Sequence, residues 1–171
     1  KKNQHKCIVI YPSVNPLKKF PRKKNIISFV GKLNRSKGFN LFGNSIIKIL
    51  KKYRNWRAIV IGDEPREVYN FKHERLEYKG WISHAKALKL YDQTSISVVP
   101  STWEEPFGRT AMEAASRGCA TIVSKRGGLV ETVNNALFLT RLNEKEIFNK
   151  IQYLIKNKKI RIKIQKKLFN K

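Results

Sequence analysis

The stretch SISVVPSTWEEPFGRTAMEAASRGCATIV, residues 95–123, decides the fold. Its two ends, 95–99 and 119–123, are apolar runs rich in β-branched residues and predict two buried strands. The segment 107–117 between them carries small residues at helical spacing, and Gly118 is placed to end a helix there. The stretch therefore predicts a strand–helix–strand unit with two parallel strands.

The same alternation of apolar runs and amphipathic segments continues on both sides of this stretch. Further strands are predicted at 26–30, 57–61, 76–79 and 136–139. Further helices are predicted at 39–53, 83–93 and 128–134. Together these elements predict an α/β domain, namely a single Rossmann-like, doubly wound parallel sheet of about six strands with helices on both faces.

The two ends of the chain differ from this middle. Residues 1–24 hold the apolar run CIVI, a possible lead-in strand, and then a proline-rich basic segment that indicates an interdomain linker. The domain itself is expected over 25–171, and its last part, 143–171, has apolar spacings that suit two amphipathic helices with basic outer faces. Such helices more often pack on their own or a partner domain than on a membrane. The first residue is Lys rather than Met, so we expect a fragment, and no signal peptide or membrane span is visible.

The charge of the chain is strongly positive. It has 37 Lys and Arg against 12 Asp and Glu, a net charge of +25, which attracts nucleic acid, anionic membranes and nucleotides alike. Lysine is spread along the whole chain, so a solvated basic surface is an equally good interpretation of this charge. Cys7 and Cys119 lie in apolar runs without ligand-like spacing and predict reduced, buried thiols in a cytosolic setting, with no metal site.

Candidate binding residues follow several of the predicted strands. Ligands of open α/β sheets bind beyond the carboxyl ends of the strands, where this chain places GKLNRSKG (31–38), EEPFGRT (104–110) and SKRGG (124–128). Each segment alone is a weak signal, since a glycine after a strand usually forms only a turn. Their common edge, and the spacing of Glu105 and Glu113, favour a binding site at which glycines, cations and acids collect.

These residues also carry a resemblance to a known family. EPFGRTAMEAASRGCATIVSKRGGLVE (105–131) resembles the signature of retaining glycosyltransferases of GT-B architecture, which transfer sugars from nucleotide-diphosphate donors. FVGKLNRSKG, IGDEP and YKGWIS resemble earlier segments of the same family in the same order. The resemblance implies that the chain is one half of a GT-B architecture, the C-terminal, donor-binding half. IYPSVNP (10–16) resembles the linker to a missing N-terminal acceptor-binding domain.

The resemblance also implies roles for particular residues. The donor diphosphate would be bound by Lys32 and Lys37, beside Gly31, and by the opening helix at Phe107, Gly108, Arg109 and Thr110. Lys32 stands where the family commonly has Arg, so a bidentate fork is lost there. Glu113 would accept hydrogen bonds from the ribose and Ile82 would lie beside the base. Glu105 would be the catalytic residue, holding the transferred sugar in place.

Simpler interpretations stay open for these residues. Glu113 could form an ordinary helix pair with Arg109, and Glu105 could only complement the helix dipole. Trp103 could line the sugar pocket or simply pack, Glu104 has no assigned role, and the histidines His73 and His84 are expected at the surface or behind the site.

The resemblance further implies a cytoplasmic enzyme, with the inner face of the cell membrane as an alternative location, that uses a nucleotide sugar and no metal. Lipopolysaccharide or other envelope polysaccharide synthesis is the expected pathway, and this fragment alone is expected to be inactive. Two alternatives are a nucleotide-sugar-binding domain of a non-transferase, such as an epimerase or a regulatory protein, and a basic nucleic-acid-binding module. No helix-turn-helix or zinc motif supports the second, so nucleic acid is not an expected partner.

Overall fold

The computed structural model describes residues 8, 10–15 and 17–170. Cys7 and Val9, and with them half of the predicted lead-in strand CIVI, lie outside these residues. Ile8 and Ile10 are exposed and belong to no strand.

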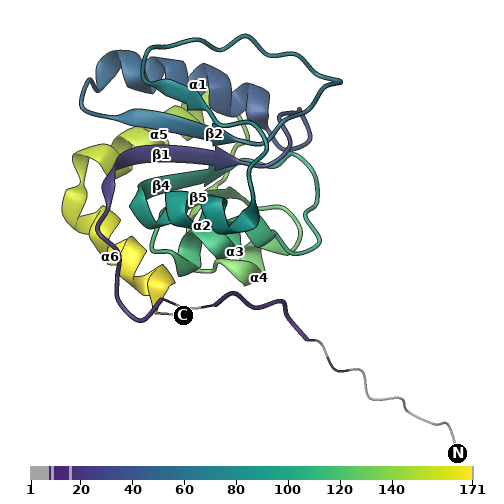
Figure 1. Ribbon diagram of the computed structural model, residues 1–171, viewed down its shortest axis with the longest axis vertical. Coiled ribbons are helices and arrows are strands. Elements are labelled where there is room, and N and C mark those ends of the chain that lie inside the picture. The colour runs from purple at the N-terminus through teal and green to yellow at the C-terminus, as the bar shows by residue number, and fades with distance from the viewer. Residues whose placement is uncertain (1–7, 9, 16, 171) are drawn as a thin grey trace, which may run out of the picture.

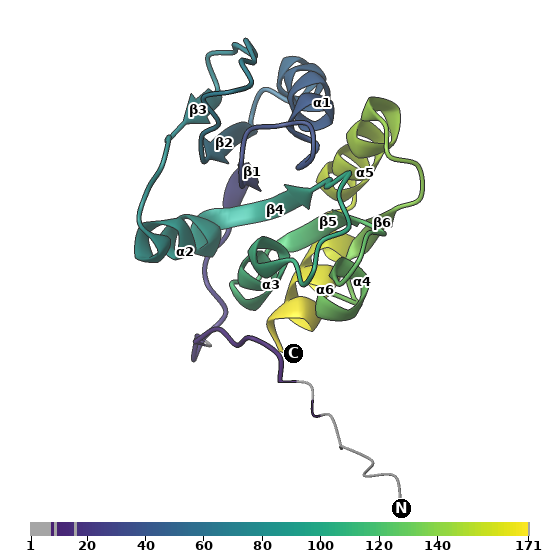
Figure 2. The ribbon, with the colours of Figure 1, turned by 90° about the vertical axis from the view of Figure 1, so that its right-hand side faces the viewer.

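The sheet has six parallel strands, as predicted: β1 (Lys24–Val30), β2 (Arg57–Ile61), β3 (Leu76–Tyr78), β4 (Thr94–Val99), β5 (Ala120–Ser124) and β6 (Leu137–Leu139). Their order is β3-β2-β1-β4-β5-β6 (Figures 1 and 2). The chain therefore builds outward from β1 in one direction and then returns to build outward in the other, which places the topological switch point between β1 and β4.

Helices cover both faces of the sheet, which confirms the doubly wound prediction. They are α1 (Phe39–Lys52), α2 (His84–Gln93), α3 (Arg109–Ser116), α4 (Leu129–Thr132), α5 (Glu144–Lys156) and α6 (Lys158–Phe169). Helices α1 and α5 lie on one face and α2 and α3 on the other (Figure 2). The apolar residues of β1 alternate accordingly, because Ile27 and Phe29 pack towards α1 while Ile26 packs towards α2.

The helix of the opening stretch is shorter than predicted at its start. It begins at Arg109, because Gly108 adopts a left-handed conformation with φ of 86°, which places Phe107 and Gly108 in the preceding loop. Its end is as predicted: Gly118 has φ of 72°, and its N–H donates to the carbonyl of Ala115. The N–H of Cys119 donates to Ala114, and together the two bonds form a Schellman motif.

A lysine fastens the segment ahead of β1 to the domain. Lys23 Nζ donates to the carbonyl of Tyr91, near the end of α2, at 2.9 Å and to the carbonyl of Arg117, at the end of α3. A cation at two helix C-termini is favoured by both helix dipoles. Burial lowers the pKa of Lys23, because the charged form gives up part of its hydration.

Cys119 is expected to resist alkylation in the folded protein. The residue is fully buried, and burial raises the pKa of its thiol to about 12, so almost none of the reactive thiolate is present at neutral pH. A Cys7→Ser variant treated with iodoacetamide at mildly alkaline pH should remain unmodified by mass spectrometry and should gain one adduct in guanidinium. Rapid modification of the folded variant would contradict the burial of this thiol.

Candidate functional site

A cavity of about 340 Å³ lies at the switch point of the sheet. The carboxyl ends of β1 and β4 form its floor, and the loop before α3 and the first turn of α3 form its wall. It is lined by Phe29, Val30, Gly31, Lys37, Val99, Glu105, Pro106, Phe107, Gly108, Arg109 and Thr110. This is the position at which open α/β sheets bind their ligands.

Most of the residues predicted from the sequence meet in this cavity: Gly31, Lys37, Glu105, Phe107, Gly108, Arg109 and Thr110. Lys32, Ile82 and Glu113 are not among the lining residues. Lys32 is exposed, beside the cavity-lining Gly31, and Ile82 packs against the apolar cluster under α2 that includes Ile59 and Ala87.

Lys37 and Glu105 form an ion pair inside the cavity. The distance from Lys37 Nζ to Glu105 Oε1 is 2.6 Å, and the Glu105 side chain is only 11% exposed. The backbone around Lys37 is held by Asn34, whose side-chain oxygen accepts from the Lys37 N–H at 3.0 Å. The cavity thus combines a fixed cation with a carboxylate, both of which are partly shielded from water.

The start of α3 offers backbone donors to the same cavity. Among the described residues no side chain caps this helix, and its first paired amides are those of Ala111 and Met112, which donate to the carbonyl of Gly108. The N–H groups of residues 107–110 have no acceptor within the described part of the chain. Such amides, with the positive end of the helix dipole, favour a bound anion.

Glu113 is buried behind the cavity, one turn into α3. Its Oε1 atom lies 3.7 Å from Arg109 Nη2 and 3.1 Å from His84 Nε2. The ion pair between Arg109 and Glu113 along α3, which the sequence left open, is therefore present. The contact with His84 was missed, because the two residues come from different helices and are 29 positions apart, and no spacing in the sequence connects them.

Glu104, which had no role in the sequence, fastens the loop of Glu105 to the loop after β5. Its Oε1 accepts from Arg126 Nη1 at 2.8 Å and its Oε2 from the Gly127 N–H at 2.5 Å. These bonds, that from Arg126 above all, lower the pKa of Glu104. The carbonyl of Glu105 accepts from the Gly128 N–H at 2.7 Å, so the catalytic candidate is held by its backbone as well.

The close approach of these two loops requires glycine. A Cβ atom on Gly127, whose φ is 49°, would lie 2.2 Å from the carbonyl oxygen of Glu105. Thr132, in α4, adds to the same contact, since its hydroxyl donates to the carbonyls of Phe107 and Gly128. We refer to these contacts between residues 104–107 and 126–132 as the loop staple.

Residues 15–170 match the sequence profile of the family described as glycosyl transferases group 1. The chain belongs to this family. Among curated group 1 relatives, an uncharacterized glycosyltransferase of Methanocaldococcus jannaschii is 29% identical over 120 residues, which cover 66% of this chain and 30% of the relative. Glycogen synthase 1 of Synechococcus is 30% identical over 69% of this chain and 26% of its own length. The chain thus spans about a third or less of these curated relatives.

Solved structures share the fold of this group 1 chain. The C-terminal domain of a glycosyl transferase group 1 family protein from Francisella tularensis has a TM-score of 0.76 and 27% identity, with 94% of this chain and 92% of that one covered. The Anabaena protein HepE, solved in complex with UDP-glucose, has a TM-score of 0.73 at 20% identity over 86% of this chain and 43% of its own. The fold is therefore that of a GT-B C-terminal half, as the resemblance implied.

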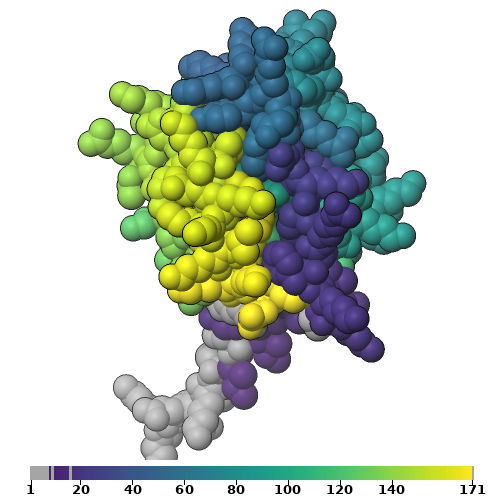
Figure 3. Space-filling model, turned by 90° about the vertical axis from the view of Figure 1, so that its left-hand side faces the viewer, coloured from purple at the N-terminus to yellow at the C-terminus, as the bar shows by residue number. Residues whose placement is uncertain are grey.

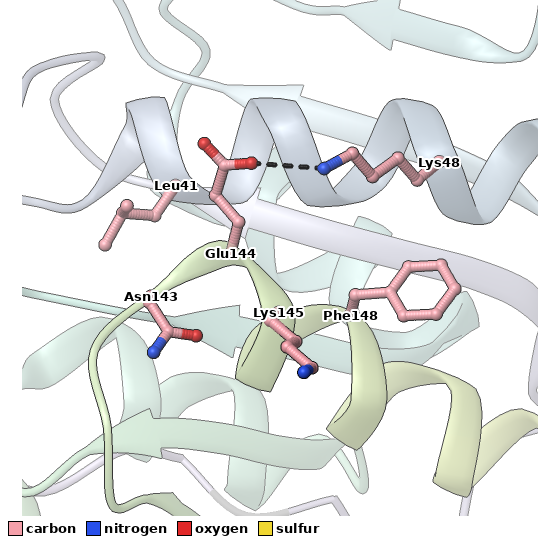
Figure 4. Close-up of a pocket in the computed structure, with 6 residues that line it drawn as sticks. All are labelled: Leu41, Lys48, Asn143, Glu144, Lys145 and Phe148. Atoms are coloured by element: carbon pink, nitrogen blue, oxygen red, sulfur yellow. Dashed lines mark hydrogen bonds and ion pairs between the residues drawn. The ribbon is translucent and has the colours of Figure 1, made fainter.

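Two larger cavities in this group 1 domain lie elsewhere. One of about 740 Å³ lies between α1 and α5, where Glu144 bridges to Lys48 at 3.3 Å (Figure 4). Asn44 also donates to Glu144, so the only carboxylate lining this cavity is already paired. The other, of about 680 Å³, is a mainly apolar cavity between residues 11–14, α3 and the end of α6. Neither is lined by residues of β1 or β4, at whose carboxyl ends an open α/β sheet binds its ligand, so size alone does not mark the site.

The described part of the chain has neither a cluster of metal ligands nor a helix suited to span a membrane. There, no three His, Cys, Asp or Glu side chains are grouped so that they could hold a metal ion. No helix within the same residues is long and apolar enough to cross a membrane.

Proposed function

We propose that this chain is the donor-binding domain of a retaining glycosyltransferase, which uses a nucleotide-diphosphate sugar. The observation that carries the proposal is the cavity at the switch point, which brings Lys37, the amides at the start of α3 and Glu105 together. Cations and amides suit a diphosphate, and a carboxylate suits the hydroxyls of a sugar. The fold shared with a protein solved with UDP-glucose supports this interpretation.

In this proposal the diphosphate lies against the start of α3. The amides of residues 107–110 and Lys37 hold its oxygens, Gly31 allows close approach, and Lys32 contributes charge from outside the cavity. Phosphate would compete with Glu105 for Lys37, and so free one Glu105 oxygen for a donor-sugar hydroxyl. Glu105 is then a positioning and electrostatic group close to the anomeric carbon.

The nucleoside would extend past Arg109 towards α2. Glu113 would accept from the ribose hydroxyls through the carboxylate that already contacts Arg109 and His84. Ile82, whose side chain packs into the domain, would contact the base through its backbone. His84 would orient the Glu113 carboxylate from the opposite side.

A thermal-shift titration with UDP, GDP, ADP and their sugars tests the proposal. A ligand at 100 times its Kd stabilises the folded state by about 2.7 kcal/mol. For a domain of this size that raises Tm by roughly 5–10 °C. We expect one nucleotide to produce such a shift and the others to produce much less. No shift with any of them would contradict the proposal.

A Glu113→Gln variant tests the assignment of the ribose. We expect it to weaken binding of the preferred diphosphate by about 10- to 100-fold, because a hydrogen bond to a charged group is lost. The 2′,3′-dideoxy analogue should bind wild-type protein and variant with equal, low affinity. If the variant still bound the ribose nucleotide more tightly than the dideoxy analogue, Glu113 would not be the residue that binds the ribose hydroxyls. Glu77→Gln, at an exposed ion pair with Lys79, is the matched control.

The complete enzyme would require an acceptor-binding half that precedes this domain, with residues 1–24 as the connection. We expect this chain alone to bind donor but to transfer sugar poorly, so that rapid turnover by it would refute this division of roles. Envelope polysaccharide or lipopolysaccharide synthesis on the cytoplasmic face of the membrane remains the proposed setting. Donor binding without any transfer by the full-length protein would favour a non-transferase instead.

A further inference from the structure

The charges of this domain are separated between the two ends of its sheet. Most acidic residues follow the carboxyl ends of strands, for example Asp63 and Glu64 after β2, Glu104 after β4 and Glu144 after β6. Only Glu74, Glu77 and Asp92 lie away from that end. The amino end of the sheet therefore faces solvent with basic residues that have few acidic neighbours.

Helix α6 crosses this amino end with its basic side outward. Its inner side is fixed by Arg161, which lies 5.0 Å from the centre of the Trp56 ring just before β2, and by Gln165, whose amide donates to the carbonyl of Ser95 in β4 at 2.8 Å. Its outer side exposes Lys158, Lys159, Ile160, Lys163, Lys166 and Lys167. The lysines thus point away from the domain.

Basic residues from other segments continue this surface on both sides of α6. Lys51 and Lys52 end α1, and Lys24 and Arg57 begin β1 and β2, all of them exposed. Figure 3 views this end of the molecule and shows α6 and α5 beside residues that lead into β1 and the end of α1. The nearby acids are already paired, Asp92 with Arg117 at 3.4 Å and Glu74 with Arg75 at 3.3 Å. We refer to this surface as the basic end.

We propose that the basic end docks on a lipid bilayer that contains anionic headgroups. Lysines near such a surface each raise the binding constant by about fivefold, and many of them face the same way here. The exposed Ile160 lies among them, and an apolar side chain in a basic helix face can enter between headgroups. The outer side of α6 has no Arg, Asn or Gln between Lys158 and Lys167, so of the residues that commonly make specific contacts with base edges it offers only lysine, which disfavours a sequence-reading nucleic-acid surface.

Docking in this manner would fix the orientation of the domain. The strands run away from the basic end, so the switch-point cavity would open on the far side of the domain. It would lie about 20 Å above the lipid surface, which is roughly the length of the seven-residue strand β1. The cavity would then face the aqueous phase, where soluble donors are found.

Sedimentation with vesicles tests the proposal. The wild-type chain should bind vesicles of roughly equal parts phosphatidylglycerol and phosphatidylcholine, should not bind phosphatidylcholine alone, and should be released by high salt, because exposed charges are screened. The triple variant Lys159→Glu, Lys163→Glu, Lys166→Glu should bind at least about 100-fold more weakly. If the Lys→Glu triple variant fails to fold, the corresponding Lys→Gln triple variant, which removes the same three positive charges, takes its place in the test.

A second triple variant separates this surface from the net charge of the chain. Lys72→Glu, Lys86→Glu, Lys145→Glu changes the charge equally at exposed positions away from α6 and should retain binding within about threefold. Equal losses in both triples, or no binding of wild type to the anionic vesicles, would overturn the proposal. Binding of duplex DNA by a chain that ignores the vesicles would overturn it in favour of a nucleic-acid surface. Thermal shifts with nucleotides should be unchanged in both triples.

Discussion

Replacement of Glu105 by Gln in the full-length enzyme is expected to lower kcat by about 10²- to 10³-fold, the range for loss of one preorganised electrostatic group. The substitution keeps the shape of the side chain and a carbonyl oxygen but removes the charge that pairs with Lys37 at 2.6 Å. Because we propose that Glu105 acts on the transferred sugar close to the reacting carbon, the effect should fall on kcat more than on the KM for donor. Initial rates at saturating donor and acceptor give both constants.

The neighbouring carboxylate provides the control for this experiment. Glu104→Gln also removes a negative charge, but its amide oxygen can still accept from Arg126 or from the Gly127 N–H, so we expect less than about a tenfold loss of kcat. Turnover near the wild-type rate in Glu105→Gln would refute its assignment. Equal losses of kcat in the two variants would show that turnover depends on the structure of the loop rather than on the charge of Glu105.

Replacement of Gly127 by Ala is expected to destabilise the domain by about 3 kcal/mol or more, because backbone strain and overpacking add at this position. The added Cβ would lie 2.2 Å from the carbonyl oxygen of Glu105. The nearest atoms all belong to the Glu105 backbone, so no flexible side chain can move aside to make room. The loop staple should open, and donor affinity should fall together with stability.

Gly80 provides the matched control. Its φ is 59°, close to that of Gly127, but a Cβ there would meet no atom within 4 Å. Gly80→Ala therefore incurs only the left-handed strain, about 1–2 kcal/mol. Urea unfolding of both variants separates the two contributions. Equal losses of unfolding free energy would show that the approach of the two loops does not depend on glycine.

Local sequence was sufficient to predict the strands, their parallel arrangement and most of the cavity. The apolar run RAIVI became β2 with the predicted bounds, since a strand buried on both faces is read directly from continuous β-branched residues. Lys37 and Glu105 could be placed at the same edge, because parallel strands bring their carboxyl ends together. The roles assigned to them were taken from the family resemblance and stay predictions.

Contacts between distant segments could not be predicted in the same way. The bond from His84 to Glu113 depends on how α2 packs beside α3, and the bond from Arg126 to Glu104 depends on the path of two loops. Neither contact produces a periodic residue pattern from which it could be predicted. The start of α3 was also misplaced, because a glycine can either join a helix or precede it in a left-handed conformation.

Lys23 has a mechanical consequence for any motion of the chain ahead of it. The side chain ties the polypeptide to the ends of two helices one residue before β1 begins, and β1 runs from there to the floor of the cavity. We expect this anchor to keep any movement of the residues ahead of Lys23 from being passed along β1. The carboxyl end of β1, which forms part of the floor of the switch-point cavity, would then keep its place.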